Sequence, residues 1–135
     1  NGKQSLIVGV QVPVNTVCPC SREISSKGAH NQRSTVRVQV KFRKFFWLED
    51  LIQLIEGSAS APVYSLLKRS DEKFITERGY ENPMFVEDVV RNVALRLDRH
   101  PNITWYQVES ENYESIHNHN AYAFVEKANR RSPRA

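Results

Sequence analysis

The sequence is poor in cysteine and has no long apolar run. Only two cysteines occur among its 135 residues, and no apolar stretch approaches the ~18 residues of a membrane span. No basic segment followed by an apolar stretch indicates a secretory leader. Cys18 and Cys20 lie two residues apart, which is a poor arrangement for a disulfide. Free thiols in such a chain predict a reducing, cytoplasmic setting.

The charge is mildly basic and does not form the pattern of a nucleic-acid surface. The net charge is +4 and the pI is about 9.2. Much of the excess lies in residues 128–135, where Arg130, Arg131 and Arg134 predict a solvated, disordered tail. No basic stripe is interleaved with aromatic residues. We therefore expect neither nucleic acid nor a membrane among the partners.

Length and composition indicate one soluble domain of ordinary size. The hydrophobic fraction of 40% and the charged fraction of 25% are typical of globular proteins. Residues 1–127 are expected to form a single module that can bury a core without disulfides. The chain begins with Asn1 directly ahead of an apparent strand, so we expect it to be a piece of a longer protein.

Four segments have the alternating apolar pattern of half-buried strands. The first two, residues 6–14 and 34–43, place valines on one face and polar residues on the other. The other two are residues 103–110 and 121–125. Pro13 cannot donate to a strand ladder, which indicates a position at an edge, an end or a bulge of the first strand.

The middle of the chain follows helical spacing instead. Residues 47–56 form one predicted helix, which Gly57 ends, and Pro62 is expected to open a short helical turn over residues 62–67. Residues 68–82 are polar and are expected to be mostly connection. The pair Asn82-Pro83 is expected to begin a strongly amphipathic helix that ends at His100-Pro101.

This order, two strands followed by helices and two further strands, predicts an α+β fold. We expect a four-stranded antiparallel sheet with two main helices packed on one face. The other face and the edges of such a sheet stay open. Since open edges pair readily with other strands, oligomerisation is expected.

The stretch VCPCSREISSKGAHNQRS, residues 17–34, carries the strongest candidates for chemistry. Cys18 and His30 lie where predicted strands meet a polar loop, and thiolate and imidazole can bind a metal or form a nucleophile with its base. A buried thiol beside an ordinary loop histidine remains the alternative. Cys20 is interpreted as a small core residue.

Other ionisable residues are less distinctive. His117 and His119 precede the last predicted strand and either reach a site at that end of the sheet or form a surface pair. Glu87 and Asp88 are typical dipole partners near a helix N-terminus, and Glu72 is typical of a solvated charge.

Four segments together resemble a known family: CPCSREIS, GAHNQRS, ERGYENPMFVEDVVR and ESIHNHNAYA. They are similar to prokaryotic type IB GTP cyclohydrolase I, of the tunnelling-fold superfamily, from the first strand to about Phe124. The resemblance implies strand-strand-helix-helix-strand-strand modules whose sheets join into a barrel on oligomerisation. Family chains carry two modules, and this chain resembles the C-terminal one, so parts of the active site are expected from neighbouring modules.

The resemblance also implies the reaction and the residues that perform it. GTP and water become 7,8-dihydroneopterin triphosphate and formate, the first step of folate biosynthesis. A divalent metal, zinc or else manganese or iron, is expected on Cys18, His30 and Glu72. His117 corresponds to a catalytic histidine, and Glu87 corresponds to the residue that anchors guanine. Candidate contacts for the triphosphate are Arg22, Lys27, Arg33, Lys68 and Arg69.

Two alternatives stay open at this point. Tunnelling-fold nitrile reductases use a cysteine as a covalent nucleophile with a nicotinamide cofactor, and Cys18 could fill that role. The histidine of the GAHNQR segment favours a metal site instead. A non-catalytic module that binds a structural metal is the second alternative.

Overall fold

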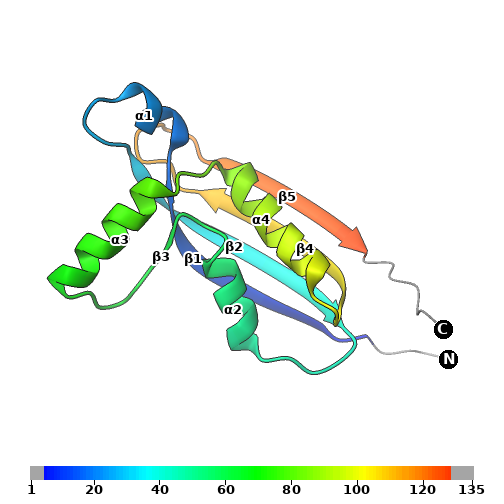
Figure 1. The fold of residues 1–135 in the computed structure, drawn as a ribbon. Helices are drawn as coiled ribbons and strands as arrows, with labels where there is room; N and C mark the ends of the chain where they lie inside the picture. Colours follow the sequence, from blue (N-terminus) through cyan, green and yellow to red (C-terminus); the bar gives the residue numbers. More distant parts are fainter. Residues whose placement is uncertain (1–4, 129–135) are drawn as a thin grey trace.

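A single antiparallel sheet organises the chain in this computed structural model, which describes residues 5–128 (Figure 1). The strand order is β3-β1-β2-β4-β5. The long strands are β1 (Ile7–Val17), β2 (Asn31–Phe42), β4 (Ile103–Asn112) and β5 (Ala121–Ala128). The α+β class and the four long antiparallel strands are confirmed. The sheet has five strands rather than four, because β3 (Ala61–Pro62) pairs with Val14 and Asn15 of β1.

Alternation along the strands explains which face is buried. Val12 and Val14 of β1 and Val36 of β2 are at most 5% exposed, and the register places Val12 opposite Val36. Val38 lies opposite Val108 in the next pair of strands. Because side chains alternate between faces with a period of two, one row of side chains from each strand, mostly valines on β1 and β2, faces the helices.

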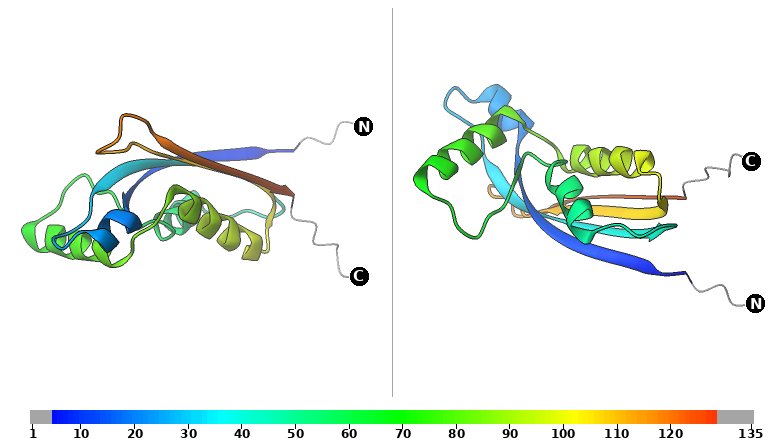
Figure 2. Two further views of the ribbon diagram at one scale, coloured as in Figure 1. Left: turned by 90° about the horizontal axis from the view of Figure 1, so that it is seen from above. Right: turned by 60° about the horizontal axis from the view of Figure 1, so that its bottom comes forward.

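Two helices cover that face, and the opposite face carries none (Figure 2). They are α2 (Leu48–Glu56) and α4 (Val86–Arg99), and both were expected. Their buried side chains follow helical spacing: Leu51 and Ile55 on α2; Val86, Val89, Val90, Val93 and Leu97 on α4. The end of α4 at His100-Pro101 is confirmed.

The predicted start of α4 is wrong. Phe85 is its N-cap, and the carboxylate of Asp88 accepts a hydrogen bond from the Phe85 N–H at 2.9 Å. This is the reciprocal half of a capping arrangement at position N3. The Asn82 amide instead donates to the carbonyls of Ala59 and Ser60, at 3.1 and 3.4 Å. A residue that is typical of a helix cap is used here for tertiary contacts.

Residues 68–82 are not connection, because α3 occupies Arg69–Glu81. Its apolar period is weak, and Gly79 is its one buried residue. Local charges support it: the Asp71 carboxylate accepts from the Lys68 N–H at 3.2 Å, and Lys73 pairs with Glu77 one turn later. The short turn expected at residues 62–67 is also wrong, since Pro62 lies in β3, where a sheet edge tolerates a residue without an N–H.

Two further points concern the ends and the loops. A short helix, α1 (Pro19–Ile24), interrupts the loop between β1 and β2. Ala128 belongs to β5, while the remainder of the predicted basic tail, with its three arginines, lies outside the described residues. Within residues 5–128, every helix is too short or too polar to cross a bilayer.

Candidate metal and substrate site

Cys18 and His30 flank the loop at one end of the β1–β2 pair. Val17 and Asn31 are the last paired residues of the two strands, and the Cys18 N–H donates to the His30 carbonyl at 3.0 Å. Ser21 on α1 closes the loop: its hydroxyl accepts from the His30 N–H and donates to the Cys18 carbonyl, both at 3.1 Å. The loop therefore holds the two residues next to each other.

Val17, the residue before Cys18, fixes the end of β1 from three sides. Its N–H donates to the Ser60 hydroxyl at 3.1 Å, and its carbonyl accepts from the Met84 N–H at 2.9 Å. Its side chain lies against Gly79 of α3, where an added Cβ would be 3.4 Å from Val17 Cγ2. Segments far apart in the sequence thus position the thiol.

The loop before β5 brings a second imidazole to His30. The ring centroids of His30 and His117 are 6.5 Å apart in an edge-on arrangement, and His117 stacks on His119 with centroids 5.3 Å apart. Ser115 of the same loop lies 3.4 Å from His30 Nδ1. A histidine that can exchange protons therefore stands beside a histidine that can bind a metal.

Cys18 and Glu87 line one cavity of about 90 Å³. Glu87 is the second residue of α4, and its side chain is exposed at the helix N-terminus. The volume is that of about three water molecules, so a purine ring would extend beyond the walls that this chain supplies. The other lining residues include Pro19, Gln32, Met84, Phe85, Asn112 and Glu114.

Buried polar residues continue from this cavity into the sheet. Gln32, Thr16, Ser34 and Asn112 are at most 6% exposed and are joined by hydrogen bonds in that order. Sequence reasoning missed them, although a signal existed. Gln32 and Ser34 occupy the same strand face as Val36, Val38 and Val40, so polar residues replace valine at one end of the buried row.

Comparisons with known proteins point to one family. A family model described as type I GTP cyclohydrolase FolE2 matches residues 1–123. The chain belongs to the type I GTP cyclohydrolase FolE2 family. Proteins named GTP cyclohydrolase FolE2 from Syntrophus aciditrophicus and Thermotoga maritima are 72% and 63% identical to it, over 93% and 91% of this chain. One from Geobacter sulfurreducens is 59% identical over 93% of the chain.

The family resemblance inferred from the sequence is thus confirmed. The matched segments are 49%, 48% and 49% of the three relatives' own lengths. The chain therefore spans about half the length of the curated FolE2 proteins that it matches.

Glu72 lies apart from the other residues that the FolE2 resemblance implicates. It is an exposed residue in the first turn of α3, which extends away from the sheet (Figure 1). It lines a shallow hollow with Arg69, Lys73, Thr76 and Glu77. Among the described residues, no three His, Cys, Asp or Glu side chains are grouped closely enough to hold an ion.

The donor chemistry nevertheless fits a metal at Cys18 and His30. Both cysteines are free, Cys18 is half-buried, and a thiolate with an imidazole suits zinc and other borderline ions. Cys20 differs, and its prediction as a core residue is wrong. It lies on α1 and is exposed, because the chain turns into a helix directly after Cys18.

The candidate cations for a triphosphate are spread around this end of the fold. The Arg22 guanidinium lies 4.8 Å from the centroid of the Tyr80 ring, which joins α1 to α3. Lys27 and Arg33 are exposed on the loop and on β2. Lys68 and Arg69 are exposed at the start of α3, beside Glu72 rather than beside Cys18.

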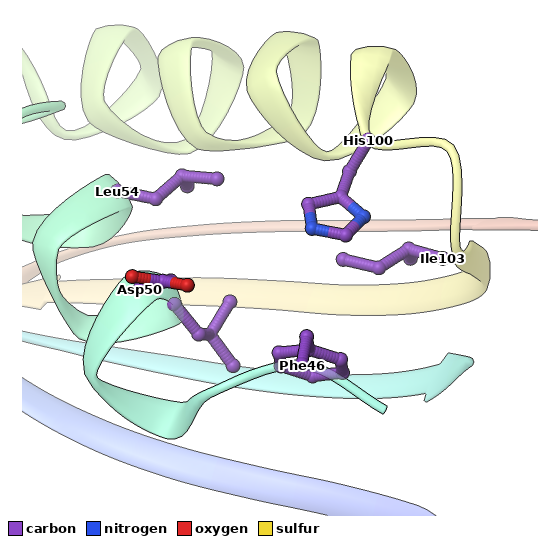
Figure 3. A pocket seen from close by; sticks show the side chains of 6 residues that line it. Phe46, Asp50, Leu54, His100 and Ile103 are labelled. Atoms are coloured by element: carbon purple, nitrogen blue, oxygen red, sulfur yellow. The ribbon is translucent and has the colours of Figure 1, made fainter. Parts of the chain in front are cut away.

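His100 belongs to a separate, small pocket between α2, the end of α4 and the start of β4, at the end of the sheet opposite Cys18 (Figure 3). His100 and Asp50 approach it from α4 and α2, with Phe46, Leu51, Leu54 and Ile103 as the remaining lining. His100 Nδ1 accepts from the Asn102 N–H at 3.2 Å, and its ring packs on Phe46 at 5.8 Å. A volume of about 20 Å³ admits about one water, so the pocket is a packing feature.

Proposed function

We propose that the protein containing this chain is a metal-dependent GTP cyclohydrolase I. It converts GTP and water into 7,8-dihydroneopterin triphosphate and formate, which opens folate biosynthesis in the cytoplasm. The observation that carries the proposal is the cavity that Cys18 and Glu87 share, with His30 joined to its lining residue Gln32 and His117 next to His30. Family membership supports the same reaction.

Glu87 is proposed to select the base. An ionised carboxylate accepts two parallel hydrogen bonds, and guanine offers two donors side by side, N1–H and the 2-amino group. Adenine lacks this donor pair and would leave the carboxylate unpaired in the cavity.

Cys18 and His30 are proposed to hold a divalent metal, zinc or else manganese or iron, with Glu72 as third ligand. When bound, such an ion acts as a Lewis acid and lowers the pKa of a coordinated water to about 7. His117 is proposed to take up and return the protons that ring opening and formate release require. Its imidazole lies next to His30 on a loop and is exposed, so it is accessible for proton transfer.

The site is proposed to be completed by other modules of the same protein. The sheet face opposite α2 and α4 is uncovered, and β5 is an edge strand of eight residues whose outer side has no partner in the described chain. Edge pairing between modules would close these sheets into the barrel of the tunnelling fold. GTP would then bind where modules meet.

Metal analysis and a GTP-to-neopterin fluorescence assay on the intact protein test the proposal together. Cys18→Ala and His30→Ala are each expected to lose both bound metal and turnover. Cys20→Ala is the matched control, because its thiol is exposed and outside the cavity. Full metal content and turnover in Cys18→Ala would reject the metal assignment.

A covalent adduct would point to the rival chemistry. Incubation with 7-cyano-7-deazaguanine is expected to leave the mass of the protein unchanged. A stable thioimide at Cys18 would instead identify a nitrile reductase and overturn the proposal.

A further inference from the structure

His30 Nδ1 is within hydrogen-bond distance of two side chains of the protein. It lies 3.1 Å from Gln32 Oε1 and 3.4 Å from the Ser115 hydroxyl. A neutral imidazole carries one proton, and the nitrogen without it is the one that can bind a metal. The partner of Nδ1 therefore decides which ring nitrogen is left as the ligand.

The buried chain of hydrogen bonds fixes what Gln32 offers to His30. Ser34 donates its single hydroxyl proton to Asn112 Oδ1, so in the contact of 3.0 Å between Thr16 and Ser34 it must accept. Thr16 has then used its own proton. It can only accept from Gln32 Nε2, which lies at 2.7 Å.

The amide orientation of Gln32 follows from that polarity. With Nε2 directed at Thr16, its Oε1 faces His30, and a carbonyl oxygen can only accept. With Asn112 Oδ1 facing Ser34, the opposite orientation of Gln32 would place two donors or two acceptors against each other along these hydrogen bonds. Because Gln32 is 6% exposed and Thr16 and Ser34 are fully buried, water cannot repair such a mismatch.

We propose that Gln32 is a positioning residue that holds His30 as its Nδ1–H tautomer and leaves Nε2 as the atom that binds the metal. The part concerning the metal rests on the proposed function, whereas the tautomer does not. Thr16, Ser34 and Asn112 act through Gln32: their side chains hydrogen-bond one another and Gln32, and Gln32 in turn contacts His30. They thereby set the direction of each proton along these hydrogen bonds. Ser115 adds a second, longer contact to the same nitrogen.

The decisive measurement is the tautomer of His30 in the intact protein after metal removal. Solid-state ¹⁵N spectra of histidine-labelled protein separate protonated from unprotonated ring nitrogens, and a His30→Asn variant identifies the signals. Wild type is expected to show a protonated Nδ1 on His30. An unprotonated Nδ1 there would overturn the proposal.

Two substitutions separate positioning from simple structural support. Thr16→Val keeps the side-chain shape but removes the acceptor for Gln32 Nε2, so the amide is free to turn and the Nδ1–H signal should decline. Gln32→Met should abolish the preference. Gln39→Met is the matched control, since Gln39 is exposed on the same strand. If the Nδ1–H signal of His30 is unchanged in both Thr16→Val and Gln32→Met, the hydrogen bonds through Gln32 do not set the tautomer and the proposal is refuted.

Cobalt titration then tests the consequence for the metal. In Gln32→Met the dissociation constant for Co²⁺ is expected to rise about 10- to 100-fold, the usual range for loss of a group that orients a ligand. The cobalt–thiolate absorption should persist, because Cys18 is untouched. If wild type shows no such band, the proposed metal site fails, while the ¹⁵N spectra still decide the tautomer. Equal affinity in wild type and Gln32→Met would overturn the positioning role.

Discussion

Ser58 and Ser60 offer a matched test of how the end of β1 is held in place. Both are fully buried and lie two residues apart, but one hydroxyl accepts a hydrogen bond from the backbone and the other donates one. Ser60 accepts from the backbone N–H of Val17 at 3.1 Å, on the side of β1 that faces away from β2. Ser58 donates to the Leu54 carbonyl at 2.7 Å, and Arg96 also donates to that carbonyl at 3.1 Å.

Ser60→Ala should therefore lower the unfolding free energy more than Ser58→Ala, although the two substitutions remove the same group. It leaves a buried N–H without a partner, which costs about 1–3 kcal/mol of unfolding free energy. One missing oxygen does not open enough space for a water to replace it. Ser58→Ala leaves the Leu54 carbonyl with the Arg96 donor, so its cost should be about 0.5–1 kcal/mol, that of one ordinary hydrogen bond.

Urea unfolding of the intact protein, followed by far-UV circular dichroism, measures both values. Because Val17 directly precedes Cys18, Ser60→Ala should also weaken metal binding more than Ser58→Ala does. Equal destabilisation by the two variants would refute the reasoning. So would a cost of Ser60→Ala below about 0.5 kcal/mol, since that is the lower limit for a hydrogen bond even when nothing is left unpaired.

Two further predictions concern the substrate and the pH dependence of stability. Glu87→Gln removes the charge that pairs with the two guanine donors, so KM for GTP should rise about 10- to 100-fold with metal content unchanged; an unaltered KM would reject the anchor role. Burial, together with the hydrogen bond to Asp98 at 2.8 Å, raises the pKa of Tyr106 above its ordinary value of about 10. The native state thus keeps this proton after the unfolded chain has lost it, and stability falls as pH rises above about 10, by up to about 1.4 kcal/mol per pH unit. Tyr106→Phe should remove this part of the alkaline loss in urea unfolding between pH 8 and 11, and an identical pH dependence in both proteins would contradict the assignment.

The strands and α4 could be predicted because burial alone dictates their patterns. Valines at every second position of β2 must face a core, and the spacing of Val86, Val90 and Val93 matches a helix and not a strand. The ends of the helices are harder to predict from the sequence. Asn82 is typical of a helix cap, but its amide binds carbonyls of a segment about twenty residues earlier, and no local pattern announces such a contact.

The helix α3 escaped prediction for a different physical reason. It has no apolar stripe, and its stability comes from end charges, an ion pair one turn apart and the approach of Gly79 to Val17. A glycine within a polar segment is typical of a turn, yet Gly79 lies inside the helix and faces β1, where an added Cβ would be 3.4 Å from Val17 Cγ2. Such a role depends on the partner and cannot be read from the segment itself.

Some residues of the candidate site could be predicted from residue type alone, and others only from the family resemblance. Residue types alone indicated Cys18 and His30, whose chemistry is distinctive at any position, whereas Glu72, Glu87 and His117 were chosen through the family resemblance. Glu87 lies in the cavity with Cys18, and His117 lies beside His30.

The placement of α3 bears directly on the third ligand. Its last turns are held by Gly79 against Val17 and by Tyr80 under the Arg22 guanidinium, and both contacts lie at the Cys18 end. Its first turn, which carries Glu72, is exposed and projects from the sheet. A carboxylate on that turn can join Cys18 only if the turn is rebuilt or if the thiol belongs to a neighbouring module. Both routes leave the contacts around Val17 intact, which is why the end of β1, rather than α3, is the fixed element of the site.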